Sequence, residues 1–110
     1  SSAAPPPVGY WPAPPSGPVH LGVALQTLTP PLARALDLDP KLRGALITEV
    51  LPGTPAERAG LSVGDVIREV DGKPVRTGDE AVEVMRSRKG VHLLRVTNAL
   101  GTRFVSVLPQ

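Results

Sequence analysis

Residues 44–67 have the sequence GALITEVLPGTPAERAGLSVGDVI, and this stretch decides the fold of the chain. Its first part, Gly44–Val50, is rich in β-branched residues and stops at Leu51-Pro52-Gly53, which predicts a strand followed by a turn. Thr54-Pro55-Ala56-Glu57 then combines a capping threonine, a proline at the first helical position and a glutamate three residues after the cap. Gly60 ends this helix after little more than one turn. The stretch therefore predicts a strand that leads through a turn into one short, capped helix.

Turn and helix-capping residues also mark the predicted elements toward the C-terminus. Asp65–Val70 predicts the next strand, and Asp71-Gly72-Lys73-Pro74 predicts a tight turn. A second capping box, Thr77-Gly78-Asp79-Glu80, begins a longer helix that ends near Gly90. The last part has the pattern of a hairpin, with two strands and a four-residue loop: Val91–Thr97, Asn98–Gly101 and Thr102–Leu108.

Two shorter elements precede this part of the chain. His20–Leu25 predicts a strand with a glycine near its start, and Thr29 followed by two prolines begins a short helix that ends before Asp39-Pro40. Together the elements predict an α+β fold, a partly open β-barrel or sandwich of five to six short strands with two main helices. Its core must be aliphatic, because Phe104 is the only aromatic residue after residue 18.

Residues 1–18 differ in composition from the rest of the chain. They hold seven of the 14 prolines and none of the charged residues, which predicts a Pro-rich disordered tail or linker that carries Tyr10 and Trp11. Residues 19–110 are then the one predicted domain. The absence of Cys excludes disulfides and thiolate zinc sites, and a net charge of only +2 from scattered residues argues against nucleic-acid binding. No apolar run approaches the roughly 20 residues that cross a bilayer, so we expect no membrane insertion by this segment.

Gly44–Ile67 resembles the central signature of a PDZ domain, in particular of the PDZ domains that follow the protease domain in HtrA serine proteases of the DegP and DegQ type. Leu21-Gly22-Val23 and the leucine-rich helix that starts at Thr29-Pro30 are also similar to the HtrA type, including its strand arrangement. The resemblance covers residues 19–110. It implies a peptide-binding module, the regulatory or substrate-recognition domain of an HtrA-like protease that acts in protein quality control in the periplasm or cell envelope.

The resemblance also implies where a peptide binds. His20-Leu21-Gly22-Val23 corresponds to the loop that holds a ligand's terminal carboxylate, and Leu21 and Val23 line the pocket for its last side chain. Ala24, Leu25 and Gln26 supply an unpaired strand edge to which the peptide adds as a further strand. Gly22 suits a backbone that a ligand approaches closely, so Gly22→Val is expected to weaken binding much more than stability. His20 stands where the family often has an aromatic or small residue, and it is an alternative ligand contact.

The longer helix forms the other wall of this groove. Counted from Thr77 as the cap, Gly78, Val82 and Met85 share one face, which we assign to the groove, while Ala81 and Val84 face the core. Two alternatives stay open: all four apolar side chains belong to the core, or a register error of one residue exchanges the two sets. Because Gly78 offers no side chain to read a ligand hydroxyl, selection is expected to rest on apolar shape.

The chain is not expected to be an enzyme. None of the six serines lies in a Gly-x-Ser-x-Gly context, the two histidines are 72 positions apart, and no metal-ligand spacing or phosphate loop is present, so no catalytic residue, metal or cofactor is predicted. The expected partners are peptide or protein C-termini with an apolar last residue, and an attached protease domain. The alternative function is a scaffold or oligomerisation domain of an envelope protein, whose groove is filled by its own tail or by a neighbouring chain.

Overall fold

The computed structural model describes residues 19–108, so the predicted tail with Tyr10 and Trp11 lies outside the described residues. The described residues form seven strands and three helices: β1 Val19–His20, β2 Val23–Thr27, α1 Pro30–Ala35, β3 Ala45–Val50, α2 Pro55–Ala59, β4 Val66–Val70, β5 Lys73–Pro74, α3 Gly78–Ser87, β6 His92–Asn98 and β7 Gly101–Val107. Within residues 19–108, no helix has the length and apolar character to cross a membrane.

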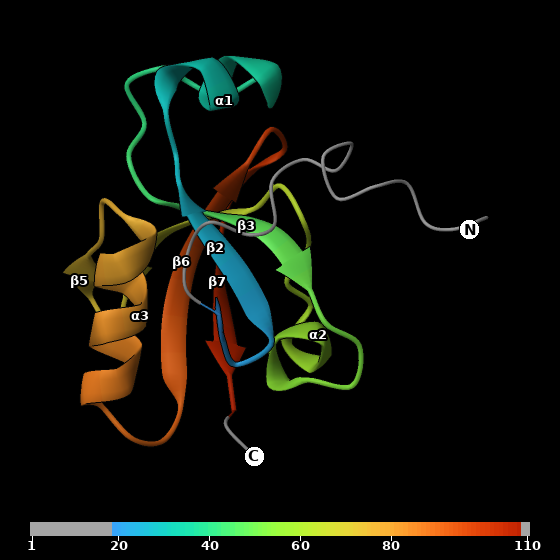
Figure 1. Cartoon of the computed structure of the whole chain (residues 1–110), viewed down its shortest axis with the longest axis vertical. Coiled ribbons are helices and arrows are strands. Elements are labelled where there is room, and N and C mark those ends of the chain that lie inside the picture. The colour runs from blue at the N-terminus through green and yellow to red at the C-terminus, as the bar shows by residue number, and fades with distance from the viewer. Residues whose placement is uncertain (1–18, 109–110) are drawn as a thin grey trace, which may run out of the picture.

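The strands form one antiparallel sheet in the order β1-β2-β3-β4-β6-β7, and the short β5 pairs with β4. Register shifts interrupt β2 between Ala24 and Leu25 and β4 between Ile67 and Glu69, and such bulges bend a sheet. In Figure 1, β2 crosses in front of β6 and β7, with α3 at one flank and α2 at the other. The predicted α+β class, with short strands curved around one core, is confirmed.

Threonine caps set the starts of the helices, as predicted. The Oγ1 of Thr54 accepts the N–H of Glu57 at 3.4 Å, and that of Thr77 accepts the N–H of Glu80 at 3.0 Å. The glutamates reach one residue further back than a standard capping box, because their carboxylates accept the N–H that precedes each cap. Gly60 ends α2 in the left-handed conformation, with φ 89°. Local side-chain chemistry thus fixes where α2 and α3 begin.

The core is aliphatic. One cluster joins residues of β2, β3, β4, β6 and β7 with α2 and α3, and a smaller cluster around Leu28 and Ala33 packs beneath α1. Phe104 is 65% exposed on β7 and does not contribute to either cluster. Since side chains from β2 and from β7 meet in one cluster, the curved sheet closes over a single interior.

Several boundaries differ from the sequence prediction, and the predicted turn over residues 71–74 contains the short strand β5. The expected strand His20–Leu25 is split into β1 and β2, because Leu21 and Gly22 both have positive φ (55° and 93°) and reverse the chain in a two-residue turn. The C-terminal hairpin has two loop residues instead of four, since Asn98 pairs with Gly101. The helix expected to run to near Gly90 ends at Ser87.

Candidate functional site

The turn at Leu21 and Gly22, the predicted carboxylate loop, is held against the segment that enters α2. The N–H of Leu51 donates to the carbonyl of Gly22 at 2.8 Å, and the N–H of Ala56 donates to the carbonyl of Leu21 at 3.2 Å. These two hydrogen bonds fix the backbone of a turn that would otherwise be free to move. The loop between β1 and β2 is therefore tied to the segment that leads into α2.

Gly22 has a structural reason to be glycine. With φ 93° it lies in the left-handed region, and a Cβ added there would overlap the Cβ and Oγ1 of Thr54. Thr54 itself is pinned, because its hydroxyl donates to the carbonyl of Leu51 at 2.6 Å. The expectation that Gly22→Val acts mainly on binding is therefore corrected: a side chain at this position disturbs the fold as well.

The residues predicted to line the pocket come together. Val23, Val82 and Met85 belong to the main core cluster, and the partly buried Leu21 packs against it. The predicted division of the helix into a groove face and a core face is not visible in burial, since Val82 (3% exposed) and Met85 (2%) are as enclosed as Ala81 (0%). Val84, predicted to face the core, packs against this cluster but is only partly buried, so it is less enclosed than the two positions assigned to the groove.

Part of the β2 edge is already paired with another strand of the same chain. The predicted unpaired backbone from Ala24 to Gln26 is partly covered, because β1 pairs with β2 on the side away from β3, with Val19 opposite Ala24 and His20 opposite Val23. The physical reason is the two-residue turn, which returns the chain directly onto its own strand. Leu25 is fully buried, and Gln26 is partly exposed.

The first turn of α3 approaches β2 just past the strand pairing with β1. The N–H of Gly78 donates to the Oγ1 of Thr27 at 3.2 Å. A Cβ added at Gly78 would lie 3.5 Å from the carbonyl carbon and Cβ of Leu25 and 3.6 Å from the N of Gln26. Gly78, predicted to face the groove, is thus buried against the strand, and Thr27 is a contact that sequence reasoning did not single out.

A polar contact between His92 and Asp71 joins β6 to the turn after β4. His92, predicted to be an ordinary strand residue, is 3% exposed, and its Nδ1 lies 2.9 Å from Oδ2 of Asp71. The N–H of Leu93 donates to the other carboxylate oxygen at 2.9 Å, and Arg88 approaches at 3.7 Å. Burial alone would raise the pKa of Asp71, but these hydrogen bonds and the charges of His92 and Arg88 hold that pKa below its ordinary value of 3.8.

Asp71→Asn is expected to lower the free energy of unfolding by about 1–2 kcal/mol at neutral pH, because a charged acceptor is lost. A carboxyl whose pKa is depressed on folding stabilises the protein above the unfolded pKa and loses that effect as pH falls through the folded pKa. The difference between wild type and variant should therefore shrink below about pH 4. Urea denaturation between pH 3 and 7 measures it.

Asp37→Asn is the matched control, since Asp37 has a similar positive φ (59°, against 53° at Asp71) but is exposed. Its substitution should leave the free energy of unfolding within about 0.5 kcal/mol of wild type at every pH. A variant at Asp71 whose deficit is the same at pH 3 and pH 7 would contradict the role given to its charge.

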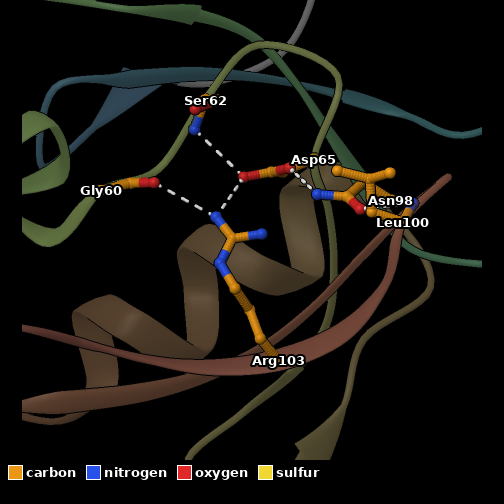
Figure 2. A network of polar contacts seen from close by, with 6 residues as sticks. All are labelled: Gly60, Ser62, Asp65, Asn98, Leu100 and Arg103. Carbon is orange, nitrogen blue, oxygen red and sulfur yellow. Dashed lines mark hydrogen bonds and ion pairs between the residues drawn. The ribbon is translucent and has the colours of Figure 1, made fainter.

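Asp65 anchors the β6–β7 hairpin to the loop between α2 and β4 (Figure 2). The residue is 2% exposed, and its carboxylate accepts hydrogen bonds from the N–H of Ser62 at 3.1 Å, Arg103 Nη2 at 2.8 Å and Asn98 Nδ2 at 2.9 Å. A surface cavity of about 460 Å³ lies beside this network. Because both carboxylate oxygens accept hydrogen bonds from protein donors, we interpret the network as a structural anchor. Residues 19–108 contain no cluster of three or more His, Cys, Asp or Glu residues able to hold a metal ion.

Comparison with known proteins places this geometry among PDZ domains. A family model described as "PDZ domain" matches residues 46–98. The chain is 41% identical over 69 residues to "Probable periplasmic serine endoprotease DegP-like" of Marinomonas sp., a match that covers 63% of this chain and 14% of that protein. The chain spans between 10% and 20% of the length of the curated relatives that it matches.

Two solved structures with the same fold contain a peptide. The HtrA3 PDZ domain bound to a phage-derived ligand, FGRWV, has a TM-score of 0.72 and 27% identity, over 83% of this chain and 84% of that one. The HtrA-type protease AlgW with a decapeptide has a TM-score of 0.70 and 30% identity, over 81% of this chain and 28% of that one. PDZ domains similar to this chain therefore bind peptides.

Proposed function

The part of this chain that the structure describes is a PDZ domain of the HtrA serine protease type, and on that premise we propose that it captures C-terminal or extended hydrophobic peptide segments by strand addition to β2. It is a binding module and not the protease domain of such an enzyme. The observation that carries the proposal is the hydrogen-bonded turn at Leu21 and Gly22, placed at the start of a strand that packs beside α3.

In this proposal, the loop His20–Val23 receives the terminal carboxylate on its backbone N–H groups. The ligand's last side chain enters between Leu21, Val23, Val82 and Met85, which one apolar cluster already unites. An apolar last residue fits these walls, and the ligand of the similar HtrA3 domain ends in valine. The backbone of Ala24, Leu25 and Gln26 pairs with the preceding ligand residues, while Gly78 adds no polar side chain to the opposite wall.

The proposal extends to the protein of which this domain is a part. Relatives of this chain include proteins named as periplasmic serine endoproteases. We expect the domain to recognise substrates or to regulate an attached protease domain. We expect this protease to act in protein quality control in the periplasm or cell envelope. Its partners are then peptide or protein C-termini, without cofactor, metal or nucleic acid.

The test compares two forms of one peptide. N-terminally labelled FGRWV with a free C-terminus is expected to bind with a dissociation constant near micromolar, as one buried aliphatic side chain and a few strand hydrogen bonds allow. The C-terminally amidated peptide should bind about tenfold or more weakly, because hydrogen bonds to a charged acceptor are lost. Fluorescence anisotropy measures both. Equal affinity of the two peptides would show that the loop does not read a carboxylate.

One observation favours the alternative, a scaffold or oligomerisation domain whose groove is filled from within the assembly. β1, a segment of the chain itself, pairs with the β2 edge at Val23 and Ala24. If the domain is a scaffold of this kind, its molecular mass in solution should rise with protein concentration, and free peptides should bind only weakly. A constant monomer mass combined with selective binding of the free acid would exclude it.

A further inference from the structure

Segments of the chain itself lie against β2 near both ends of the strand. β1 pairs at Val23 and Ala24, and the first turn of α3 lies against Leu25, Gln26 and Thr27. We infer that the structure is the closed state of the groove, and that the hydrogen bond from the Gly78 N–H to Thr27 Oγ1 is the clasp that holds α3 on β2. This inference rests on the proposed function, whose site it regulates.

The distances leave no room for a ligand strand. A strand that pairs with β2 must lie about 4.8 Å from it, with side chains reaching further on either face. A Cβ added at Gly78 would lie only 3.5 Å from Leu25 and 3.6 Å from the N of Gln26, so no more than a methyl group fits between the first residue of α3 and the strand. A peptide can therefore pair beyond Ala24 only after the first turn of α3 has moved away from β2.

Glycine at position 78 makes this closure possible. A Cβ would just fit at ordinary contact distance from Leu25 and Gln26, so any longer side chain pointing the same way would prop the helix off the strand. Gly78 is also the first residue of α3, and its N–H is one of the donors that a helix cannot satisfy internally. Thr27, at the last position of β2, supplies the missing acceptor from 51 residues earlier in the chain.

β1 closes the other end of the same edge. It runs antiparallel to β2 and leads directly into the turn at Leu21 and Gly22. A C-terminal peptide that adds antiparallel to β2, with its carboxylate in the loop, has the same direction and the same pairing partners. The ligand must therefore displace β1 from Val23 and Ala24 as well as separate α3 from Leu25.

A closed state that dominates the free protein reduces apparent affinity by the fraction of molecules that are open. Removing the clasp should raise this fraction and tighten binding, while the free fold loses one hydrogen bond. Stability and affinity should then change in opposite directions. A threonine with a purely structural role would change stability alone.

The experiment compares Thr27→Val with Thr48→Val. Thr48 is the matched control, because its hydroxyl also donates to β2, to the carbonyl of Ala24 at 3.2 Å, but from β3. Thr27→Val should bind free-acid FGRWV about two- to tenfold more tightly than wild type, the factor that corresponds to one neutral hydrogen bond. It should also unfold at lower urea concentration. Thr48→Val should unfold earlier without a change in affinity.

Amide hydrogen exchange of the free proteins supplies a readout that needs no peptide. Thr27→Val should accelerate exchange at Gly78 by a similar factor, and Thr48→Val should not. If wild type binds FGRWV but Thr27→Val binds it equally or more weakly, the closed state does not control access and the inference is overturned. If no variant prefers the free acid to the amide, the proposed function fails instead, and unchanged exchange at Gly78 in Thr27→Val would overturn the clasp separately.

Discussion

Gly22→Ala is expected to lower the free energy of unfolding by about 2–5 kcal/mol, the combined cost of a left-handed non-glycine residue and of an overlap in a packed site. At φ 93° the new Cβ would overlap the Thr54 side chain, which caps α2 and donates to the carbonyl of Leu51. The turn would have to shift, and with it the two backbone hydrogen bonds that tie Leu21 and Gly22 to the α2 segment. Peptide binding should fall along with stability, since the same turn is the proposed carboxylate loop.

Gly53→Ala separates the two causes. Gly53 also has a positive φ, 75°, but a Cβ there would meet nothing within 4 Å. Its substitution should carry only the conformational penalty, about 1–2 kcal/mol. Urea denaturation of both variants gives the difference, which measures the overlap with Thr54. Equal losses of stability at positions 22 and 53 would contradict the steric role of Thr54.

The sequence predicts well those features whose causes lie within a few residues. The hydroxyl oxygens of Thr54 and Thr77 each accept the N–H of the residue three positions later in the sequence, which caps α2 and α3. Gly60 ends α2 because glycine readily adopts the left-handed conformation. Alternating and β-branched segments likewise predict β3, β4, β6 and β7 to within about two residues. These signals are local, so they survive without knowledge of the tertiary structure.

The contacts that decide the site are not local. Gly22 meets Thr54, Thr27 accepts from Gly78, and Asp71 bonds to His92, although 21 to 51 residues separate the partners. No periodicity or motif in the chain encodes which threonine will meet which glycine. The pairing of β1 with β2 was missed for another reason, since a turn with two left-handed residues needs Leu21 at φ 55°, a conformation uncommon for leucine.

The sequence pattern of α3 also does not predict which of its side chains are buried. A helical wheel places Val82 and Met85 on one face and Ala81 and Val84 on another, but Val82, Met85 and Ala81 are all buried while Val84 is only partly buried. The prediction that Val82 and Met85 line a ligand pocket therefore stays a prediction. Measuring FGRWV affinity in the Thr27→Val background would show whether these side chains become accessible when α3 opens.

Asp65→Ala is expected to destabilise the fold by about 3 kcal/mol, because removing one partner of a buried ion pair leaves the others unpaired. The Asp65 carboxylate is the common acceptor for Ser62, Asn98 and Arg103, and Arg103 also donates to the carbonyl of Gly60 at 3.1 Å (Figure 2). The Arg103 side chain is 40% exposed and can turn to water, which limits the loss. The Asn98 amide and the Ser62 N–H have less freedom to do so, because both are tied to backbone that the hairpin and the α2–β4 loop hold in place.

Asp65→Asn distinguishes the charge from the shape. An asparagine has one acceptor oxygen and one NH2 group, whereas Asn98 donates to Oδ1 and both Ser62 and Arg103 donate to Oδ2. Whichever way the amide is turned, its NH2 faces a donor, so the isosteric variant should lose nearly as much stability as Asp65→Ala. Asp39→Ala is the control, an exposed aspartate with one local bond to the Lys41 N–H, and its effect should stay within about 0.5–1 kcal/mol. If Asp65→Asn were as stable as wild type in urea, the three donors would have found other acceptors, and the network could not be what joins the β6–β7 hairpin to the start of β4.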